Sequence, residues 1–264
     1  MHDIEPRDVR FDLTDVPKAW HGGQLSVSLF FDALSVFFPV GERFFVKTVK
    51  AYRDEIDDVG LKADVAAFCA QEGHHGREHD RYNDMLRQQG LPVDALERQV
   101  VRLLGVASAV LPKRRQLAVT CALEHFTSLL GVLVLDDPKT LEGAHPTMAA
   151  LWKWHAAEEN EHKAVAFDVY RRVGGGTLAR SWQMLVVTMM FWLHVAFFHL
   201  RFMHAAGILF SLKEHVALAR YLVGGERGLQ DLVKPYFRYF SPSFHPNEID
   251  TQPLVERWKA GYSP

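Results

Sequence analysis

The stretches Glu72-Gly73-His74-His75 and Glu159-Asn160-Glu161-His162 each place a glutamate three residues before a histidine. Both stretches lie in sequence that predicts helix, and at this spacing the two side chains leave the same helical face. Glu-x-x-His on two helices, with a single glutamate from each of two others, forms the dinuclear carboxylate site of four-helix bundles. The two stretches therefore predict an all-α fold built around a metal site.

Two further glutamates supply the missing carboxylates. The four glutamates follow one another at steps of 30, 52 and 35 residues, in the order Glu42, Glu72, Glu124 and Glu159. A step of about 30 residues fits one helix, a turn and the return to the same level, at about 1.5 Å rise per residue. The longer middle step fits a crossover connection. We therefore predict a ferritin-like four-helix bundle with extra flanking helices.

Glycine and proline signals divide the chain into four regions of one all-α domain, residues 1–264. These regions are an N-terminal arm and helix (1–38), the metal-binding bundle (39–173), apolar flanking helices (177–223) and an aromatic-rich C-terminal tail (224–264). The four bundle helices are expected over 40–57, 61–89, 113–135 and 146–173. The segment 93–112 is expected to link the second and third of these helices.

Glu124 is the most informative single position, because it is the only carboxylate in residues 98–135 and the sequence around it is strongly apolar. Burying a lone carboxylate is costly unless it is paired, hydrogen-bonded or bound to metal. An ion pair with Arg114 or Arg115 is the alternative, but those residues lie two to three turns away on the same helix. Glu42 is weaker evidence, since a glutamate in the first turn of a helix is common.

The histidines complete the predicted ligand set. His155 stands four residues before Glu159 and so shares its helical face. His79 lies one turn beyond His75, which leaves open whether His79 or His155 is the third histidine ligand. Mixed carboxylate and imidazole ligation suits iron or manganese, so we expect two iron ions, with manganese or zinc as alternatives. The expected ligands are Glu42, Glu72, His75, Glu124, His155, Glu159 and His162, with His79 as the further candidate.

The sequence also resembles known families. The ligand order resembles non-haem di-iron carboxylate proteins, and His155-x-x-x-Glu159-x-x-His162 resembles the arylamine N-oxygenases, in which a third histidine joins four glutamates. The sequence around the ligands is similar to a bacterial family labelled predicted metal-dependent hydrolase, over almost the whole chain. That label implies a class of enzyme without establishing a reaction. The similar stretches are Phe38-Pro39-Val40-Gly41-Glu42, Gln71-Glu72-Gly73-His74-His75, residues 154–163 and Ser243-Phe244-His245-Pro246.

We favour a di-iron enzyme that activates O₂ to oxidise or oxygenate a small or lipid-like substrate, with an electron-donor protein as partner. The alternative is a hydrolase that uses a metal-bound water. For that reading His75-Gly76-Arg77-Glu78-His79 matches the H-x-x-E-H of inverted zinc peptidases, with Glu78 as general base. This motif leaves Glu42 and Glu124 unexplained. Ferritin-like iron handling is a third class, for which the chain is longer than a minimal bundle requires.

Composition bounds the partners and the compartment. The formal net charge of −2 gives no basic field for nucleic acid. Two cysteines and a polar N-terminus predict a cytoplasmic protein. Trp182–Leu200 contains no Asp, Glu, Lys or Arg, and is long enough to span a bilayer, lie on its surface or form a buried helix. Membrane association through 182–200 and a homodimer both stay open.

Overall fold

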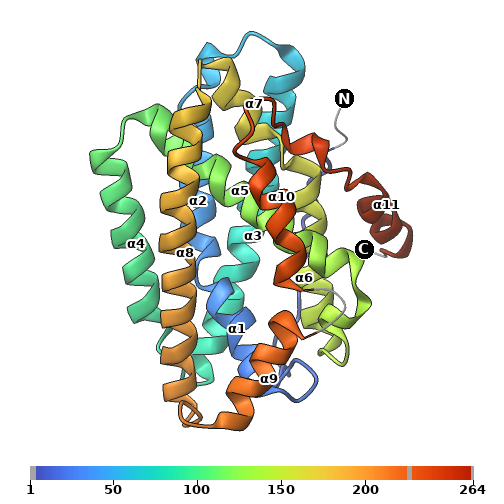
Figure 1. The fold of residues 1–264 in the computed structure, drawn as a ribbon. Helices are drawn as coiled ribbons and strands as arrows, with labels where there is room; N and C mark the ends of the chain where they lie inside the picture. Colours follow the sequence, from blue (N-terminus) through green and yellow to red (C-terminus); the bar gives the residue numbers. More distant parts are fainter. Residues whose placement is uncertain (1–3, 225–227, 263–264) are drawn as a thin grey trace.

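The computed structural model describes residues 4–224 and 228–262, and these residues contain helices and no β-strand (Figure 1). The predicted all-α class is confirmed. The helices are α1 (Leu25–Ser35), α2 (Phe38–Lys50), α3 (Val59–Gln88), α4 (Val93–Val110), α5 (Lys113–Asp136), α6 (Pro146–His162), α7 (Val165–Arg172), α8 (Thr177–Ala205), α9 (Leu212–Val223), α10 (Val233–Arg238) and α11 (Gln252–Gly261).

The predicted helices over 61–89 and 113–135 correspond closely to α3 and α5. The segment 93–112, expected to link the second and third bundle helices, forms α4 for most of its length, between two prolines. That helix buries Val93, Leu96 and Val100, whose three- and four-residue spacing is typical of an amphipathic helix. The proline-flanked segment is therefore a helix with one apolar face.

Two other predicted helices are shorter than expected. The helix predicted over 40–57 is α2, which starts at Phe38 with Pro39 in its first turn and ends at Lys50. The helix predicted over 146–173 is interrupted after His162 and continues as α7. At this break the buried Lys163 ammonium donates hydrogen bonds to Ile249 O and Thr251 Oγ1, 2.5 and 2.6 Å away.

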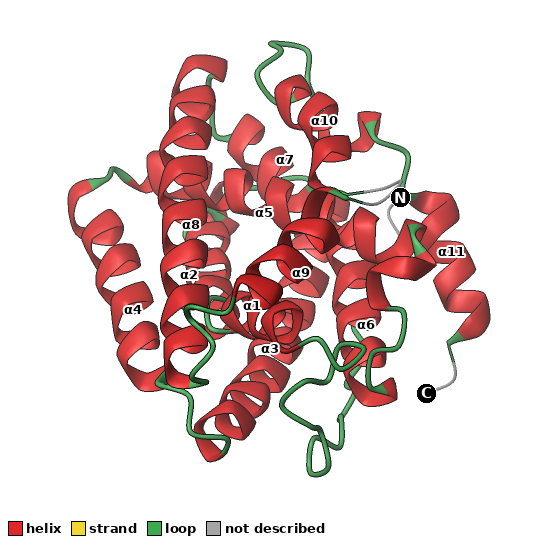
Figure 2. Cartoon of the chain, turned by 60° about the horizontal axis from the view of Figure 1, so that its bottom comes forward, coloured by secondary structure: helices red, strands yellow, loops and turns green. Residues whose placement is uncertain are grey.

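Four helices enclose the centre of the molecule. Helix α2 packs against α3 and α5, and α6 packs against the same two helices. Helix α8 covers α5 and α1, and α4 lies beside α2 at the edge of the molecule in both views (Figures 1 and 2). That the four central helices form a ferritin-like bundle stays a prediction.

Two apolar clusters flank one polar layer, one on each side of it along α3. One cluster includes Tyr82 on α3 and Trp152 on α6, and the other includes Phe68 on α3 and Val165 on α7. The residues between these positions on α3 and α6 include the predicted ligands, all buried. Water is therefore excluded from the layer that carries the acidic side chains.

Candidate metal centre

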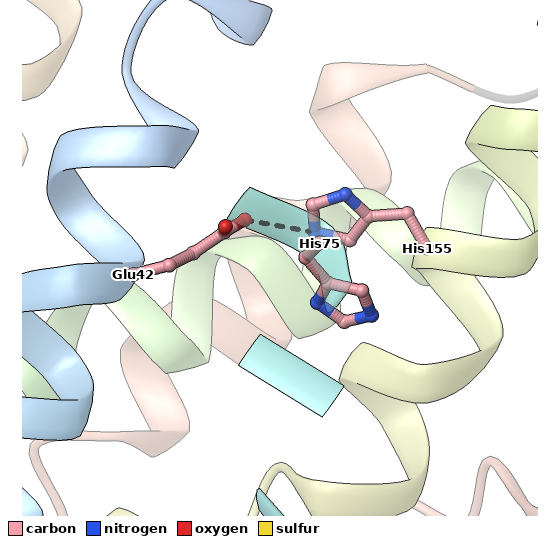
Figure 3. A group of neighbouring side chains, drawn as sticks. All are labelled: Glu42, His75 and His155. Carbon is pink, nitrogen blue, oxygen red and sulfur yellow. Dashed lines mark ion pairs between the residues drawn. The ribbon is translucent and has the colours of Figure 1, made fainter. Parts of the chain in front are cut away.

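The central polar layer brings together all seven predicted ligands. Each is at most 3% exposed. Three groups of atoms within 4.8 Å of one another connect them: Glu42 with His75 and His155; Glu72 with His75 and Glu159; and Glu72 with Glu124 and His162. Figure 3 shows Glu42 reaching from α2 toward His75 and His155, with a dashed line for the 3.9 Å pair between Glu42 Oε1 and His155 Nε2. These groups overlap, so they form one continuous cluster of carboxylates and imidazoles.

The cluster leaves buried polar atoms without hydrogen bonds. Both carboxylate oxygens of Glu42, Glu72 and Glu124 have no hydrogen-bond partner among the described residues. His162 Nε2 is in the same condition, although it lies 3.1 Å from Glu72 Oε1 and 3.5 Å from Glu124 Oε2. A buried charge without a partner is costly, and buried polar atoms in native proteins are usually hydrogen-bonded or bound to an ion. Metal ions between these atoms fit that requirement.

The charges in the cluster also favour bound metal ions. Burial and the neighbouring carboxylates raise the pKa values of Glu42 and Glu124 well above their usual range. Glu159 differs, because the imidazoles of His155, His162 and His75 lie beside its carboxylate, outweigh burial and hold its pKa well below its usual value. Four ionised glutamates carry four negative charges, which two divalent cations would balance. The residues present therefore fit two ions.

Two histidines are held in place by a hydrogen bond at the ring nitrogen that faces away from the cluster. His75 Nε2 lies 3.0 Å from Glu158 Oε2, so it donates to a carboxylate, and Nδ1 faces the cluster without a hydrogen-bond partner. His162 Nδ1 lies 2.8 Å from Gln71 Oε1, so it is the donor there and leaves Nε2 bare. Metal-binding histidines are commonly oriented in this way through their second nitrogen. The carboxylates of Glu158 and Glu159 outweigh burial and raise the pKa of His75 to about 9 in the absence of metal.

A chain of hydrogen bonds fixes the third histidine. Ser35 Oγ donates to Asn83 Oδ1 at 2.9 Å and accepts from His79 Nδ1 at 2.9 Å. A neutral His79 then accepts at Nε2 from His155 Nδ1, 2.7 Å away. This order leaves His155 Nε2 as a lone pair, 3.0 Å from Glu159 Oε1. Burial favours neutral rings, since it lowers the pKa of His79 well below its usual value and that of His155 to about 4.

The positions of the two rings favour His155 over His79 as the third histidine of the cluster. His155 belongs to the cluster, whereas both ring nitrogens of His79 are used in holding His155 and Ser35. His74 is half-exposed and belongs to none of the groups. Glu158 belongs to none of the groups either, and the structure buries it completely against His75.

Glu78 does not reach the cluster. Its Oε1 accepts from Arg77 Nε at 2.9 Å, and its Oε2 accepts from Arg81 Nη1 at 2.7 Å and from Phe11 N at 3.1 Å. Both oxygens are thus committed to arginines and the N-terminal arm. The geometry gives no support to Glu78 as the general base of an H-x-x-E-H site, because His79 also lies outside the metal groups.

Sequence reasoning missed Gln71 and Arg7. Gln71 Nε2 donates to Glu161 Oε2 at 2.8 Å while its oxygen holds His162. Arg7, in the N-terminal arm, contacts Glu158 Oε1 at 3.1 Å and Glu161 Oε1 at 2.8 Å. The only signal for Gln71 is its place directly before Glu72, and nothing in the local sequence marks Arg7.

A glycine gives the cluster room. A Cβ on Gly76 would lie 3.1 Å from Glu42 Oε2, which is tighter than ordinary contact. Gly73, one turn earlier on α3, faces open space and would accept a Cβ without contact. Gly76 therefore lets the Glu42 carboxylate approach α3.

Two cavities reach the cluster. The larger, about 230 Å³, is lined by His155, Glu159 and mainly apolar side chains, with Lys139 and Arg220 among its exposed residues. The smaller, about 150 Å³, lies between α2, α4, α5 and α8 and reaches Glu42. Phe38 lines both, and its ring is 4.4 Å from the ring of His155. Apolar molecules could thus approach the cluster from two sides.

Fold and site together define an all-α protein with a buried cluster of carboxylates and imidazoles that can hold metal. The family model described as predicted metal-dependent hydrolase matches residues 5–250, so the chain belongs to that family. The resemblance drawn from the sequence is confirmed for this family, and the likeness to arylamine N-oxygenases stays a prediction. No curated protein and no solved structure gives a significant match.

Proposed function

We propose that the seven clustered side chains hold two divalent metal ions and that the protein is a hydrolase of a small or lipid-like substrate. The observation that carries the metal site is the orientation of its histidines. Each of the three turns one ring nitrogen toward the carboxylates of the cluster while the other nitrogen is held by Glu158, Gln71 or His79. The family description supports hydrolysis as the reaction.

Bound divalent ions would lower the pKa of a water ligand and polarise a substrate carbonyl or phosphoryl oxygen. The protein itself fixes the imidazoles, excludes bulk water and offers the cavity beside His155 and Glu159 to the substrate. Because Glu78 is held by Arg77 and Arg81, the proton acceptor in this proposal is a carboxylate of the cluster. The proposed reaction therefore differs from that of inverted zinc peptidases.

Oxidation with O₂ is the second candidate, and the donor set favours it. Four carboxylates and three imidazoles with no thiolate suit iron or manganese better than zinc. The mainly apolar cavity also suits a substrate without ionisable groups. This reaction would require an electron-donor protein. Iron handling without a substrate is not favoured, since storage needs neither cavity.

The test begins with metal content per chain, measured on the purified protein and again after anaerobic loading with ferrous iron, manganese or zinc. Hydrolysis of ester, amide and phosphoester panels by the metal-loaded chain, without O₂ consumption, would support the hydrolase. Substrate-dependent O₂ consumption by the iron form, with no hydrolysis, would replace it with the second candidate. Fewer than two ions under every loading condition would overturn the dinuclear site.

A further inference from the structure

One face of α8 exposes a continuous apolar stripe. Among the described residues, three helical stretches are long and apolar enough to cross a membrane, and two of them are mostly buried inside the protein. The third is α8, which is only 33% buried. Its exposed large apolar side chains recur every three or four residues and are 42–88% exposed. They are Leu178, Trp182, Leu185, Met189, Leu193, Phe197 and Leu200.

The stripe borders the mouth of the smaller cavity. Val186 and Met190 line that cavity, are half-buried, and follow the exposed Leu185 and Met189 by one position each. The opposite wall is α4, which contributes Ala107 among others and lies next to α8 at the edge of the molecule (Figures 1 and 2). The exposed apolar surface thus continues inward toward the metal cluster.

The cavity itself is suited to a hydrocarbon chain. Its lining is apolar apart from Glu42, Thr127 and Gln183. Along α4 the lining residues extend from Val100 to Ala107, or about 10 Å of helix at 1.5 Å per residue, and Leu111 follows just after the helix. An elongated apolar cavity with a cluster carboxylate at one point matches a chain better than a compact polar molecule.

The sequence windows around this face carry an excess of positive charge. Residues 98–123 hold five Lys or Arg and no Asp or Glu, and residues 169–213 hold another five with no Asp or Glu, although the whole chain carries −2. Two of these cations already have partners, since the buried Arg180 binds the Tyr239 and Ser241 carbonyls and the exposed Arg172 pairs with Asp57. The others are all exposed: Arg98, Arg102, Lys113, Arg114, Arg115, Arg171, Arg201 and Lys213. Such a field complements anionic lipid headgroups.

We propose that the α4–α8 face docks on an anionic lipid surface and that the cavity between these helices takes the hydrocarbon chain of the substrate from it. The assignment of the chain as substrate rests on the proposed metal-dependent function. A second copy of the protein is the other natural occupant of the stripe. A twofold contact would, however, bring together two faces on which cations outnumber acidic side chains, since the acidic residues of α4, Asp94 and Glu97, are already paired with Arg87, and this is unfavourable.

Docking is tested by flotation of the metal-loaded chain with vesicles of phosphatidylcholine alone and of equal parts phosphatidylcholine and phosphatidylserine. The chain should float with the anionic vesicles, and Leu185→Glu should weaken this binding by at least about tenfold. Val59→Glu is the matched control, because Val59 is 80% exposed on α3, outside α4 and α8, and lines neither cavity. Equal flotation of the two variants, or none by the unaltered chain, would overturn the proposal. So would a dimer that Leu185→Glu converts to monomers.

Chain uptake is tested with a dansyl-labelled fatty acid, whose emission brightens and shifts to the blue in an apolar cavity. Ala107→Phe should abolish this change by filling the cavity, whereas Val106→Phe should keep it, because Val106 is 60% exposed and lines neither cavity. Equal binding by both variants would show that the chain does not enter between α4 and α8. Neither assay involves turnover, so failure of the proposed reaction would leave both results standing, and failure of either assay would leave metal content and hydrolysis to be judged separately.

Discussion

The histidine of each Glu-x-x-His motif is hydrogen-bonded to the residue directly before the glutamate of the other motif. His75 of α3 is bound by Glu158, the residue directly before Glu159, and His162 of α6 is bound by Gln71, the residue directly before Glu72. The pattern is thus a cross-connection between two helices. It is not symmetric in chemistry, because one partner is a carboxylate and the other an amide. A repeated motif can therefore give two different metal environments.

A second difference lies four residues before each glutamate. On α6 this position is His155, which the cluster uses, whereas on α3 it is Phe68, whose ring packs 4.9 Å from the ring of His162. The α6 side therefore has an extra imidazole, and the α3 side has an apolar wall. We expect the two metal positions to differ in affinity for this reason.

The largest expected effect is a difference in metal content between alanine variants of Glu159 and Glu72, the glutamates of the two motifs. Glu159 lies within 3.0–3.7 Å of all three histidines, whereas Glu72 is 3.1 Å from His162. Alanine at Glu159 should remove both ions, and alanine at Glu72 should remove about one. Metal content after dialysis against buffered metal measures this, with the exposed Glu142→Ala as control. Two ions retained by Glu159→Ala would contradict the assignment of the ligands.

The next largest effect is on metal affinity, and it distinguishes the hydrogen bond between His75 and Glu158 from the one between His162 and Gln71. Glu158→Gln should weaken metal binding about 10- to 100-fold, because it removes the carboxylate that orients His75. Gln71→Ala should cost less, since it removes a neutral hydrogen bond to His162. Competition with a chelator gives both affinities. A larger loss for Gln71→Ala would reverse the comparison.

A smaller effect is expected where Glu42 approaches α3. Gly76→Ala should lower metal affinity severalfold, because its Cβ would press on Glu42 Oε2. Gly73→Ala on the same helix should leave affinity unchanged and raise the free energy of unfolding by about 0.5–1 kcal/mol. Chelator competition and urea unfolding separate the two variants. Equal metal affinity in both would show that the space at Gly76 is not needed.

The smallest effect concerns the chain that holds His155. Ser35→Ala should cost about 1 kcal/mol of unfolding free energy and reduce metal affinity slightly, through His79. Ser26→Ala, which removes a buried hydrogen bond to Glu214 O, should cost similar stability and leave metal affinity alone. Calorimetric titration of the two variants side by side measures the difference. If Ser26→Ala lowered affinity as much, the chain through His79 would have no specific effect on the metal.

The sequence predicted the cluster well because helical periodicity is a local rule. The spacing of three within each motif and of four between His155 and Glu159 fixes which side chains share a face, whatever the tertiary contacts. The partners of the histidines could not be predicted in this way. Gln71 and Glu158 are assigned to His162 and His75 only once α3 and α6 lie against each other.

Other parts of the fold could not be predicted from the spacing of residues along the chain. Helix α4 was missed because its apolar positions are separated by exposed valines and arginines, which blur the helical period. The break after His162 coincides with the bonds from Lys163 to residues 249 and 251, far along the chain. The role of Glu78 was suggested by a five-residue motif, and only the position of Arg77 and Arg81 showed where its oxygens point.

Arg7 has a practical consequence for anyone who handles this protein. Through Glu158 it supports His75, and through Glu161 and Gln71 it supports His162, so one guanidinium near the chain start steadies both sides of the cluster. Proteolytic nicking or a bulky fusion near this residue would leave the helices intact while loosening both imidazoles. A preparation damaged there would look well folded by circular dichroism and yet lose its metal during purification.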